Sequence, residues 1–403
     1  MNSRRLLLLA VACGGSALVA GCAAPSGASV AVQVQAPAKP SVVAAQPPQV
    51  TVEPVDQARA VPLDTPVTVT SPDGTLTAVA VTRVGGGLLA GALTADQHTW
   101  TSSDGLDPAA EYRVVATAAG AGGTHTSTAA TFTTMTRVSR RLLSTATPAD
   151  GEVVGVGEPI DLSFNVAIAP AQQAGIVQRL HVVSTPAQPG AWRWFGPSEL
   201  HYRPAQYWQP GTKVTVTADF HGVNAGNGAW GLAGWSRTFA VGDKHVSLID
   251  NNTHLMQVYS NDQLINTWPV SLGKPGFETL SGTLVVLYKT PVVKMSSCAT
   301  FHGAACTPGN ANYYDENVYA DTAVSTNGYF IHAAPWSVAS QGVVNVSHGC
   351  VNLSTARATA FYNWSVPGDV VVISNTSNIA DINNGEADWQ IPFAQWDNTG
   401  VVH

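Results

Sequence analysis

Short segments in which apolar and polar residues alternate follow one another from about residue 50 to residue 242. Three of them are TPVTVTS, EYRVVATA and TKVTVTADF, and turn-forming stretches such as SPDG separate these segments. Alternation with a period of two places every second side chain on the same face, which predicts half-buried β-strands. Many short strands at this spacing are typical of a β-sandwich. Only 11% of the residues are charged, which also suits β-rich modules better than helical bundles.

A weak internal repeat divides this region into two. The stretch GLDPAAEYRVVATA (105–118) aligns with YWQPGTKVTVTADF (207–220), with proline over proline and then alternating apolar positions. The period is close to the length of one immunoglobulin-like domain. We therefore expect a first immunoglobulin-like domain over 50–142 and a second over 143–242. The Trp-rich stretch AWRWFGP (191–197) fits either a core with a domain interface or a ligand-binding surface.

The chain from 243 to 376 has a different pattern, in which strands are mixed with one short helix. A hairpin turn is expected near SNDQ, and GTLVVLYK, GYFIHAA and DVVVIS indicate strands. Residues 354–365 carry apolar side chains at helical spacing, with Ser354 or Thr355 as the N-cap. The expected fold class is therefore mainly β, with two immunoglobulin-like β-sandwich domains followed by a β-rich domain with a short helix after Cys350. The last segment, 377–403, contains GEADWQIPFAQW, which is too apolar for a free end and is expected to pack back on the body.

The N-terminus has the pattern of an export signal rather than of a folded domain. Arg4 and Arg5 precede the apolar stretch LLLLAVACGGSALVA, and VAGC, which ends at Cys22, resembles a lipobox. We expect residues 1–21 to be a signal peptide that is cleaved before Cys22, and the Cys22 thiol to carry lipid such as palmitate. The Pro- and Ala-rich segment 22–49 would then be a tether to the outer face of the cytoplasmic membrane. An ordinary signal peptide that happens to contain Cys22 is the alternative.

Length and charge limit the remaining possibilities. With 403 residues, the chain is expected to form two to four domains. Its net charge is −7 and it has no long cluster of Lys and Arg, so nucleic-acid binding has little support. Beyond the N-terminal segment, no stretch is long and apolar enough to span a bilayer. We predict no metal and no cofactor.

The five cysteines fall into three groups. Cys13 would leave with the signal peptide, and Cys22 would carry the lipid. Cys298 and Cys306 are close in sequence, so they could close a short disulfide loop in an oxidising compartment. Cys350 would then be unpaired. The alternatives are that these last three cysteines are all reduced, or that Cys350 pairs instead.

Cys350 lies in a sequence context that suits a nucleophile. A catalytic cysteine needs a thiolate, a base and donors for the oxyanion that forms when it attacks a carbonyl group. Cys350 is expected just before a helix, whose dipole would lower the pKa of the thiol. His332 ends a predicted strand upstream, and the loop between them is long enough to bring the two side chains together. Backbone N–H groups around His348 and Gly349 could form an oxyanion hole, with Gly349 permitting a tight turn.

Two other interpretations use the same residues. Cys350 could be a small buried hydrophobic residue and His332 a core histidine with its hydrogen bonds satisfied. Alternatively, His348 and Cys350 could bind zinc together with His332 or His302, although the chain has no C-x-x-C or H-x-x-x-H spacing to support this.

The complete pattern is more specific than its parts. IHAAPW…SHGCVNLS closely resembles the active-site motif of L,D-transpeptidases, the YkuD domain family, in which a His is followed by a spacer, Ser/Thr-His-Gly-Cys, an apolar residue and Asn. SLGKPGFETLSGTLVV (271–286) resembles the Gly-Lys…Thr-Pro-x-Gly stretch of that family, although Leu280 replaces the Pro. The lipoprotein signal, the two immunoglobulin-like domains and GEADWQIPFAQW resemble the mycobacterial members. The resemblance covers nearly all of the mature chain.

The resemblance implies a role for individual residues. Cys350 would be the nucleophile, His332 its base, and His348 a residue that positions groups or stabilises charge. The backbone carbonyl of Ala333 would orient the imidazole of His332, at a position where mycobacterial relatives often have Ser. Asn327 and the Cys298–Cys306 loop depart most from the family pattern, which affects the shape of the lid. The residues implied to line the substrate site are Tyr314, Asn327, Gly328, Trp336 and Asn352.

The implied activity is acyl transfer between peptidoglycan stem peptides. Cys350 would form a thioester with the third residue of a tetrapeptide stem and release the terminal D-Ala, and the side-chain amine of a second stem would then give a 3→3 cross-link. With water as acceptor, the protein would be an L,D-carboxypeptidase instead. A wall-binding lipoprotein without activity is the alternative from another class. The resemblance also implies that carbapenem β-lactams acylate Cys350.

Overall fold

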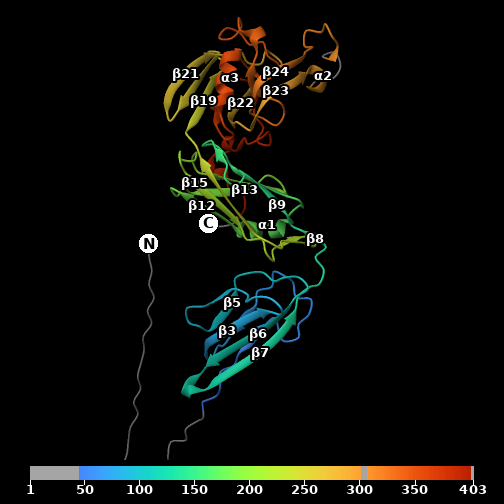
Figure 1. Cartoon of the computed structure of the whole chain (residues 1–403), viewed down its shortest axis with the longest axis vertical. Coiled ribbons are helices and arrows are strands. Elements are labelled where there is room, and N and C mark those ends of the chain that lie inside the picture. The colour runs from blue at the N-terminus through green and yellow to red at the C-terminus, as the bar shows by residue number, and fades with distance from the viewer. Residues whose placement is uncertain (1–44, 301–305, 401–403) are drawn as a thin grey trace, which may run out of the picture. The chain divides into compact units, whose positions relative to one another are not determined.

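The computed structural model describes residues 45–300 and 306–400 (Figure 1). The predicted signal peptide, Cys22, most of the predicted tether and residues 301–305 with His302 lie outside these ranges. Within them, no helix is long and apolar enough to cross a membrane. Strands greatly outnumber helices among the described elements, so the predicted mainly β fold class is confirmed.

The first immunoglobulin-like region is a sandwich of two antiparallel sheets. Alternate residues of its strands point inward, and the rings of Tyr112 and Phe132 stack with their centroids 5.3 Å apart in its core. Trp100 and Leu76 are buried beside them. One sheet has the order β1-β2-β5-β4 and the other β3-β6-β7, with β1 Thr51–Glu53, β2 Thr68–Thr70, β3 Thr75–Arg83, β4 Gly91–Leu93, β5 Thr99–Ser102, β6 Glu111–Ala119 and β7 His125–Thr133.

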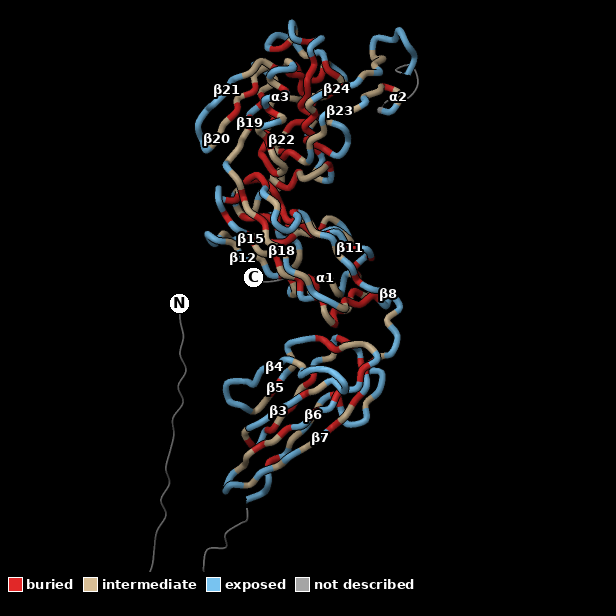
Figure 2. Tube along the Cα trace, in the orientation of Figure 1, coloured by how far each residue is buried: buried red, intermediate tan, exposed pale blue. Residues whose placement is uncertain are grey.

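The second immunoglobulin-like region repeats this two-sheet design. Figure 2 shows buried residues along its strands, and Trp192 and Trp208 are among the largest buried side chains. Its sheets are β13-β14-β11-β9 and β10-β18-β15-β12, and a small sheet β16-β17-β8 lies at one end together with helix α1 (Pro170–Val177). The strands are β8 Arg140–Arg141, β9 Ser144–Thr147, β10 Val153–Val154, β11 Ile160–Phe164, β12 Leu180–Thr185, β13 Gly190–Trp194, β14 Glu199–Pro204, β15 Lys213–Ala218, β16 Asn224–Gly226, β17 Ala229–Trp230 and β18 Trp235–Val241.

The third strand-rich region contains a six-stranded sheet, β21-β20-β19-β27-β22-β28, and a four-stranded sheet, β23-β24-β25-β26. The turn of the β20–β21 hairpin contains Asn261 and Asp262 with φ of 48° and 65°, as a two-residue hairpin turn requires, so the hairpin predicted near SNDQ is confirmed. The strands are β19 His245–Asp250, β20 Leu255–Ser260, β21 Gln263–Pro269, β22 Leu280–Val285, β23 Tyr288–Ser296, β24 Asp315–Ala323, β25 Phe330–Ala333, β26 Val351–Leu353, β27 Val370–Ser374 and β28 Asn378–Ile379.

Helix α3 (Thr355–Trp364) begins where the sequence predicts it. The hydroxyl of Ser354 caps it by accepting from the backbone N–H of Arg357. Its inward face buries Ala358 and Phe361 in the core of the third region. The helix therefore covers the strands that carry the candidate active site.

The C-terminal segment packs against the second immunoglobulin-like region. Trp396 is fully buried, and its indole N–H donates to the carbonyl oxygen of Ala191 at 2.7 Å. The guanidinium of Arg203 lies 4.5 Å from the ring centroids of both Trp389 and Trp396. The Trp-rich stretch 191–197 is therefore part of a core and an interface. Two 3-10 turns carry the contact, η4 (Asp388–Gln390) and η5 (Phe393–Gln395).

Candidate active site

Two parallel neighbouring strands place the predicted nucleophile and base. β25 ends with His332 and Ala333, and β26 begins one residue after Cys350. His332 pairs in register with Asn352, so the two strands bring the predicted motif residues together. The chain between the strands includes the 3-10 turn η3 (Pro335–Ser337).

The imidazole of His332 is held in one tautomer. The ring is 4% exposed, and its Nδ1 lies 3.0 Å from the carbonyl oxygen of Ala333. Because a carbonyl oxygen only accepts, Nδ1 carries the proton and Nε2 keeps its lone pair. Burial lowers the pKa of His332 to about 4, although the bond to Ala333 opposes this shift. The ring is therefore a neutral base, and Ala333 supplies the carbonyl contact that the family resemblance implies.

Cys350 is the free cysteine among the described residues. Burial of the sulfur raises the pKa of its thiol to about 12, and the charge of Asp321 adds to this effect. The Sγ lies 3.7 Å from the carbonyl oxygen of Gly328, a weak contact in which the thiol is the donor. The resting thiol is therefore protonated, and a base would have to take its proton before the sulfur could act as a nucleophile.

The predicted lowering of the Cys350 pKa by a helix dipole is wrong, because the pKa is raised. Strand β26 and Ser354 separate Cys350 from the first residue of α3, Thr355. The dipole of a helix acts on groups close to its first turn, and β26 takes the sulfur out of that range. The helix dipole therefore does not account for activation of the thiol.

His348 is held by a lysine that the sequence analysis did not single out. The ammonium of Lys274 lies 3.0 Å from Nε2 of His348 and 2.9 Å from Oδ1 of Asn312. Because an ammonium group only donates, Nε2 of His348 is the acceptor. Burial and the positive charge of Lys274 lower the pKa of His348 to about 4. The signal for Lys274 was present in the sequence, since it belongs to the Gly-Lys stretch that resembles the family.

The residues before Cys350 fix the turn that presents it. The hydroxyl of Ser347 donates to the carbonyl oxygen of Cys350 at 2.6 Å and accepts from the N–H of Gly349 at 3.1 Å. Gly349 has φ of 127°, and a Cβ there would lie 2.8 Å from the ring of Tyr329. Only glycine fits this position. The Gly349 N–H, which we place in the oxyanion region from the sequence, is bonded to Ser347 in this structure.

A cavity of about 1100 Å³ opens over these residues. Charged side chains of both signs reach it, including Lys274, Lys294, Glu278 and Glu316. Ala333 and Gly349 are not among the residues that line it. The cavity brings together the catalytic candidates and every residue predicted to line the substrate site, namely His332, His348, Cys350, Tyr314, Asn327, Gly328, Trp336 and Asn352.

One wall of this cavity comes from the segment that carries the disulfide. Cys298 and Cys306 are bonded, with their Cα atoms 4.5 Å apart. Cys298 lies in the short helix α2 (Ser297–Thr300). The backbone N–H of Ser297 donates to the carbonyl oxygen of Tyr314 at 2.9 Å, and the N–H of Tyr314 donates to the hydroxyl of Ser297 at 3.2 Å. The disulfide segment therefore positions Tyr314 at the cavity.

Asp321 is a further residue that the sequence analysis missed. It lies in an irregular part of the β24–β25 pairing, next to Ala320 with φ of 53°. Its side chain is completely buried, and burial raises its pKa to about 7. A carboxyl group close enough to act on the thiol of Cys350 therefore changes its charge near neutral pH.

Two family models match the chain. One, described as an L,D-transpeptidase catalytic domain, matches residues 244–373, and another, described as a bacterial Ig domain, matches residues 58–224. The fold and the site are thus those of an L,D-transpeptidase domain that follows immunoglobulin-like domains.

Similar proteins agree with this class. L,D-transpeptidase 2 of Mycobacterium tuberculosis (strain CDC 1551 / Oshkosh) is 35% identical over 351 residues, which cover 87% of this chain and 84% of that protein. L,D-transpeptidase 5 of M. tuberculosis (strain ATCC 25618 / H37Rv) is 31% identical and covers 87% of this chain and 76% of its own length. A solved structure of LD transpeptidase LdtMt1 in complex with imipenem is 26% identical, covers 58% of this chain and 99% of that chain, and has a TM-score of 0.49. The chain belongs to the L,D-transpeptidase family, as its active-site motif predicts.

Proposed function

We propose that this protein forms 3→3 cross-links between peptidoglycan stem peptides through a thioester on Cys350. The observation that carries this proposal is that one cavity is lined by both a protonated thiol, Cys350, and a neutral imidazole of fixed tautomer, His332. Nδ1 of His332 donates a hydrogen bond to the carbonyl oxygen of Ala333, so the basic Nε2 is the atom that can take the thiol proton. A cavity of about 1100 Å³ leaves room for a peptide beside them.

In the first step, the sulfur of Cys350 attacks the carbonyl carbon at the L-centre of the third stem residue, while Nε2 of His332 takes the thiol proton. The carbonyl oxygen becomes an oxyanion and is stabilised by donors at the site. When the oxyanion collapses, the bond to the D-Ala nitrogen breaks. The imidazolium returns its proton to that nitrogen, so D-Ala leaves as the free amino acid and the thioester remains.

In the second step, the side-chain amine of a second stem attacks the thioester carbonyl. His332 takes a proton from this amine, and the collapsing intermediate expels the thiolate. The thiolate recovers that proton, so the enzyme ends in its starting state. Because burial raises the pKa of Cys350 to about 12, the thiol form is restored after each turnover.

Several side chains are suited to bind the donor peptide. The amide Nδ2 of Asn352 donates to the hydroxyl of Ser337 at 3.2 Å, and its buried Oδ1 has no hydrogen-bond partner within residues 45–300 and 306–400. This oxygen can accept from a substrate N–H. Trp336 is 55% exposed and offers an aromatic wall. The cationic groups of Lys274 and Lys294 suit a substrate with carboxylates.

Incubation with a disaccharide-tetrapeptide tests this function and separates it from hydrolysis. We expect a cross-linked dimer and free D-Ala from the wild-type chain, and neither from Cys350→Ala. Tripeptide without dimer would assign an L,D-carboxypeptidase. If neither product forms and Cys350 is found in a disulfide, the protein is not a transpeptidase.

We also propose that a carbapenem acylates Cys350, as the family resemblance implies. Intact-protein mass spectrometry with imipenem should show one adduct on the wild-type chain. The adduct should be absent in Cys350→Ala and retained in a control in which an exposed residue of another domain is changed, such as His181→Gln.

The last part of the proposal concerns location. We propose that Cys22 is lipidated and anchors the protein to the outer face of the cytoplasmic membrane, with the following segment as tether. In cells fed a labelled fatty acid, the label should enter the wild-type chain and not Cys22→Ala, which should be released from membranes. Labelling of Cys22→Ala would argue against this anchor.

A further inference from the structure

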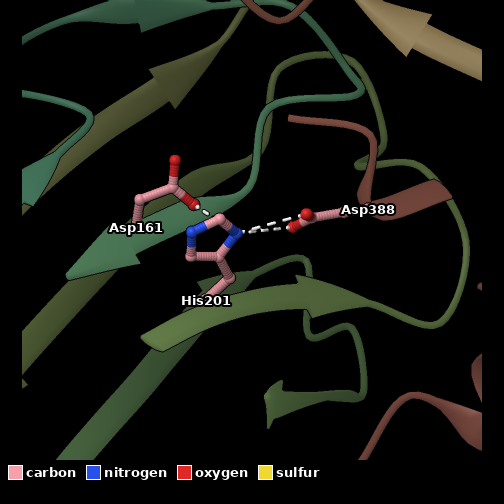
Figure 3. Close-up of side chains that lie close together, drawn as sticks. All are labelled: Asp161, His201 and Asp388. Carbon is pink, nitrogen blue, oxygen red and sulfur yellow. Dashed lines mark hydrogen bonds and ion pairs between the residues drawn. The ribbon is translucent and has the colours of Figure 1, made fainter. Parts of the chain in front are cut away.

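A second cluster of ionisable side chains lies far along the chain from Cys350. Asp161 on β11 and His201 on β14 are directly opposite each other in the sheet register, and Asp388 comes from η4 of the C-terminal segment. Figure 3 shows the three side chains converging on one point. Asp388 is fully buried and His201 is 5% exposed. One potential ligand atom from each residue lies within 4.8 Å of the others.

Three carboxylate oxygens surround a single ring nitrogen. Nδ1 of His201 is 3.2 Å from each oxygen of Asp388 and 3.3 Å from Oδ1 of Asp161. A ring nitrogen carries one hydrogen at most, and that hydrogen cannot serve three acceptors well. The buried Oδ1 of Asp161 has no hydrogen-bond partner among the described residues. A buried carboxylate oxygen without a donor points to a cation at the centre of the cluster.

The spacing of these atoms matches a coordination sphere. Zinc binds imidazole nitrogen and carboxylate oxygen at about 2.0–2.2 Å, so the atoms around a tetrahedral ion lie roughly 3.3 Å from one another. The separations of 3.2 and 3.3 Å from Nδ1 agree with this value. A mixed set of one imidazole and two carboxylates suits Zn²⁺ better than Ca²⁺ or Mg²⁺, which prefer oxygen alone.

The other side of the imidazole carries the partner that a metal-bound histidine usually has. Nε2 of His201 is 3.1 Å from Oε1 of Glu199. Histidines that bind a metal generally donate their second N–H to a carboxylate or carbonyl, which directs the remaining lone pair to the ion. With Nε2–H donated to Glu199, Nδ1 is free to coordinate.

The surroundings are rich in negative charge. Glu386 interacts with Asp161, and its buried Oε2 has no hydrogen-bond partner among the described residues. Arg203 is nearby, but its guanidinium donates to the backbone carbonyls of Pro204 and Ile391. A divalent cation would offset the excess of carboxylates.

We propose that Asp161, His201 and Asp388 bind one Zn²⁺ ion, which fastens the C-terminal segment to the second immunoglobulin-like region. The site is structural, because all three ligands lie outside the catalytic cavity. It also does not depend on the proposed transpeptidase activity. The competing state is a metal-free cluster in which a protonated His201 forms ion pairs with Asp388 and Asp161.

The test uses the full chain, stripped of metal with a chelator and titrated with Zn²⁺ alone by calorimetry. We expect one ion per chain and a higher melting temperature with Zn²⁺. Limited proteolysis should cut the segment after 377 faster in the stripped protein than in the loaded one. Replacing Zn²⁺ by Co²⁺ should give the visible absorption bands of a nitrogen- and oxygen-ligated ion, a readout that needs no variant.

Isosteric variants locate the ion. Asp388→Asn and Asp161→Asn should each lower the affinity for Zn²⁺ by at least tenfold. The matched control is His181→Gln, which removes an exposed histidine 3.4 Å from Asp219 in the same region and should bind Zn²⁺ like the wild type. The proposal is overturned if the stripped wild-type chain binds no Zn²⁺ at micromolar concentrations. It is equally overturned if folded Asp388→Asn and Asp161→Asn bind Zn²⁺ as tightly as the wild type.

Discussion

His332 and His201 are both buried histidines on sheet strands, yet their surroundings set opposite charge states. His332 has one partner at Nδ1, a carbonyl oxygen, and burial lowers its pKa to about 4. Burial by itself would also lower the pKa of His201, but the charge of Asp161 and the hydrogen bonds that the ring donates to Asp388 and Glu199 raise it to about 11 when no metal is bound. Burial thus lowers the pKa of an imidazole that has no charged neighbour, and nearby carboxylates reverse the direction of this shift.

The difference explains why one histidine suits catalysis and the other suits cation binding. An imidazole that stays neutral keeps a lone pair on Nε2 and can accept the proton of Cys350. An imidazole among carboxylates instead belongs to a site that attracts positive charge, either a proton or a metal ion. The same residue type therefore supplies a base in one region and a ligand in the other.

The largest expected effect comes from replacing each of the two histidines separately by glutamine. His332→Gln should lower the rate of Cys350 acylation by imipenem by about 10²–10⁴-fold, because the thiol loses its base. His201→Gln should leave that rate within a few-fold of the wild type while the Zn²⁺ affinity falls. Stopped-flow absorbance gives the acylation rate and calorimetry gives the affinity.

His181→Gln is the control for both measurements, since its side chain is exposed and lies in neither site. The assigned difference between the two histidines is wrong if imipenem acylates Cys350 in His332→Gln at the wild-type rate. That result would mean that another group, such as His348, removes the thiol proton.

The second-largest expected effect is a pH dependence of the unfolding free energy that is caused by the lowered pKa of His332. Its folded pKa of about 4 is below the ordinary 6.5, so between these values the unfolded chain binds a proton that the folded chain does not. The contribution of His332 to the unfolding free energy is therefore fully present above about pH 6.5 and is lost as the pH falls toward 4. The slope is up to about 1.4 kcal/mol per pH unit.

Urea unfolding of the wild type and of His332→Gln at several pH values measures this slope. The difference in unfolding free energy between the two proteins should shrink as the pH falls through this window. His348 and the buried carboxyl groups are common to both proteins, so their contributions cancel. Parallel curves would show that His332 is not held neutral in the fold.

The sequence predicted the active-site pair well because its members are close along the chain. Ser347, His348, Gly349 and Cys350 are consecutive, and His332 ends the strand that lies beside them. The carbonyl contact of Ala333 was also predictable, because it is a backbone group and does not depend on the side chain. The raised pKa of the Cys350 thiol was not, because it comes from burial of the sulfur, which depends on tertiary packing.

The sequence could not predict the residues that only tertiary structure brings together. Lys274 and His348 are 74 positions apart, and His201 and Asp388 are 187 apart. Metal-ligand motifs have a recognisable spacing when the ligands share one element or one loop. Asp161, His201 and Asp388 come from two strands and a distant 3-10 turn, so their spacing in the sequence does not indicate a metal site. For this reason we predicted no metal from the sequence.

A third prediction changes the charge beside a histidine in the active site. Lys274 acts on His348 in the opposite sense to the carboxylates around His201, because its positive charge lowers the pKa of the ring. In Lys274→Met, the pKa of His348 should rise from about 4 toward 6.5 without reaching it, since burial remains. A titration of the imidazole resonances by NMR measures the change.

Lys294→Met is the matched control for that titration. Lys294 also lines the cavity, but its ammonium is paired with Asp315 at 2.7 Å. Its removal should leave the pKa of His348 unchanged. An equal shift in both variants would mean that the total charge of the cavity, rather than the contact with Lys274, sets this pKa.

The smallest effect concerns a carboxylate beside the cysteine, where the consequence is the reverse of that at His201. A negative charge raises the pKa of either group, but this favours the charged form of a histidine and disfavours the charged form of a cysteine. Asp321 has a pKa of about 7 and raises the pKa of Cys350. In Asp321→Asn, alkylation of Cys350 by iodoacetamide should be faster than in the wild type by less than tenfold. The gain should be confined to pH values above about 7, where Asp321 is ionised.

Glu316→Gln is the matched control, because it removes a carboxyl group that lines the cavity. The rate at which iodoacetamide alkylates Cys350 in this variant should follow the wild type at every pH. A gain in Asp321→Asn that persists at acidic pH would show that packing, rather than charge, links Asp321 to the thiol.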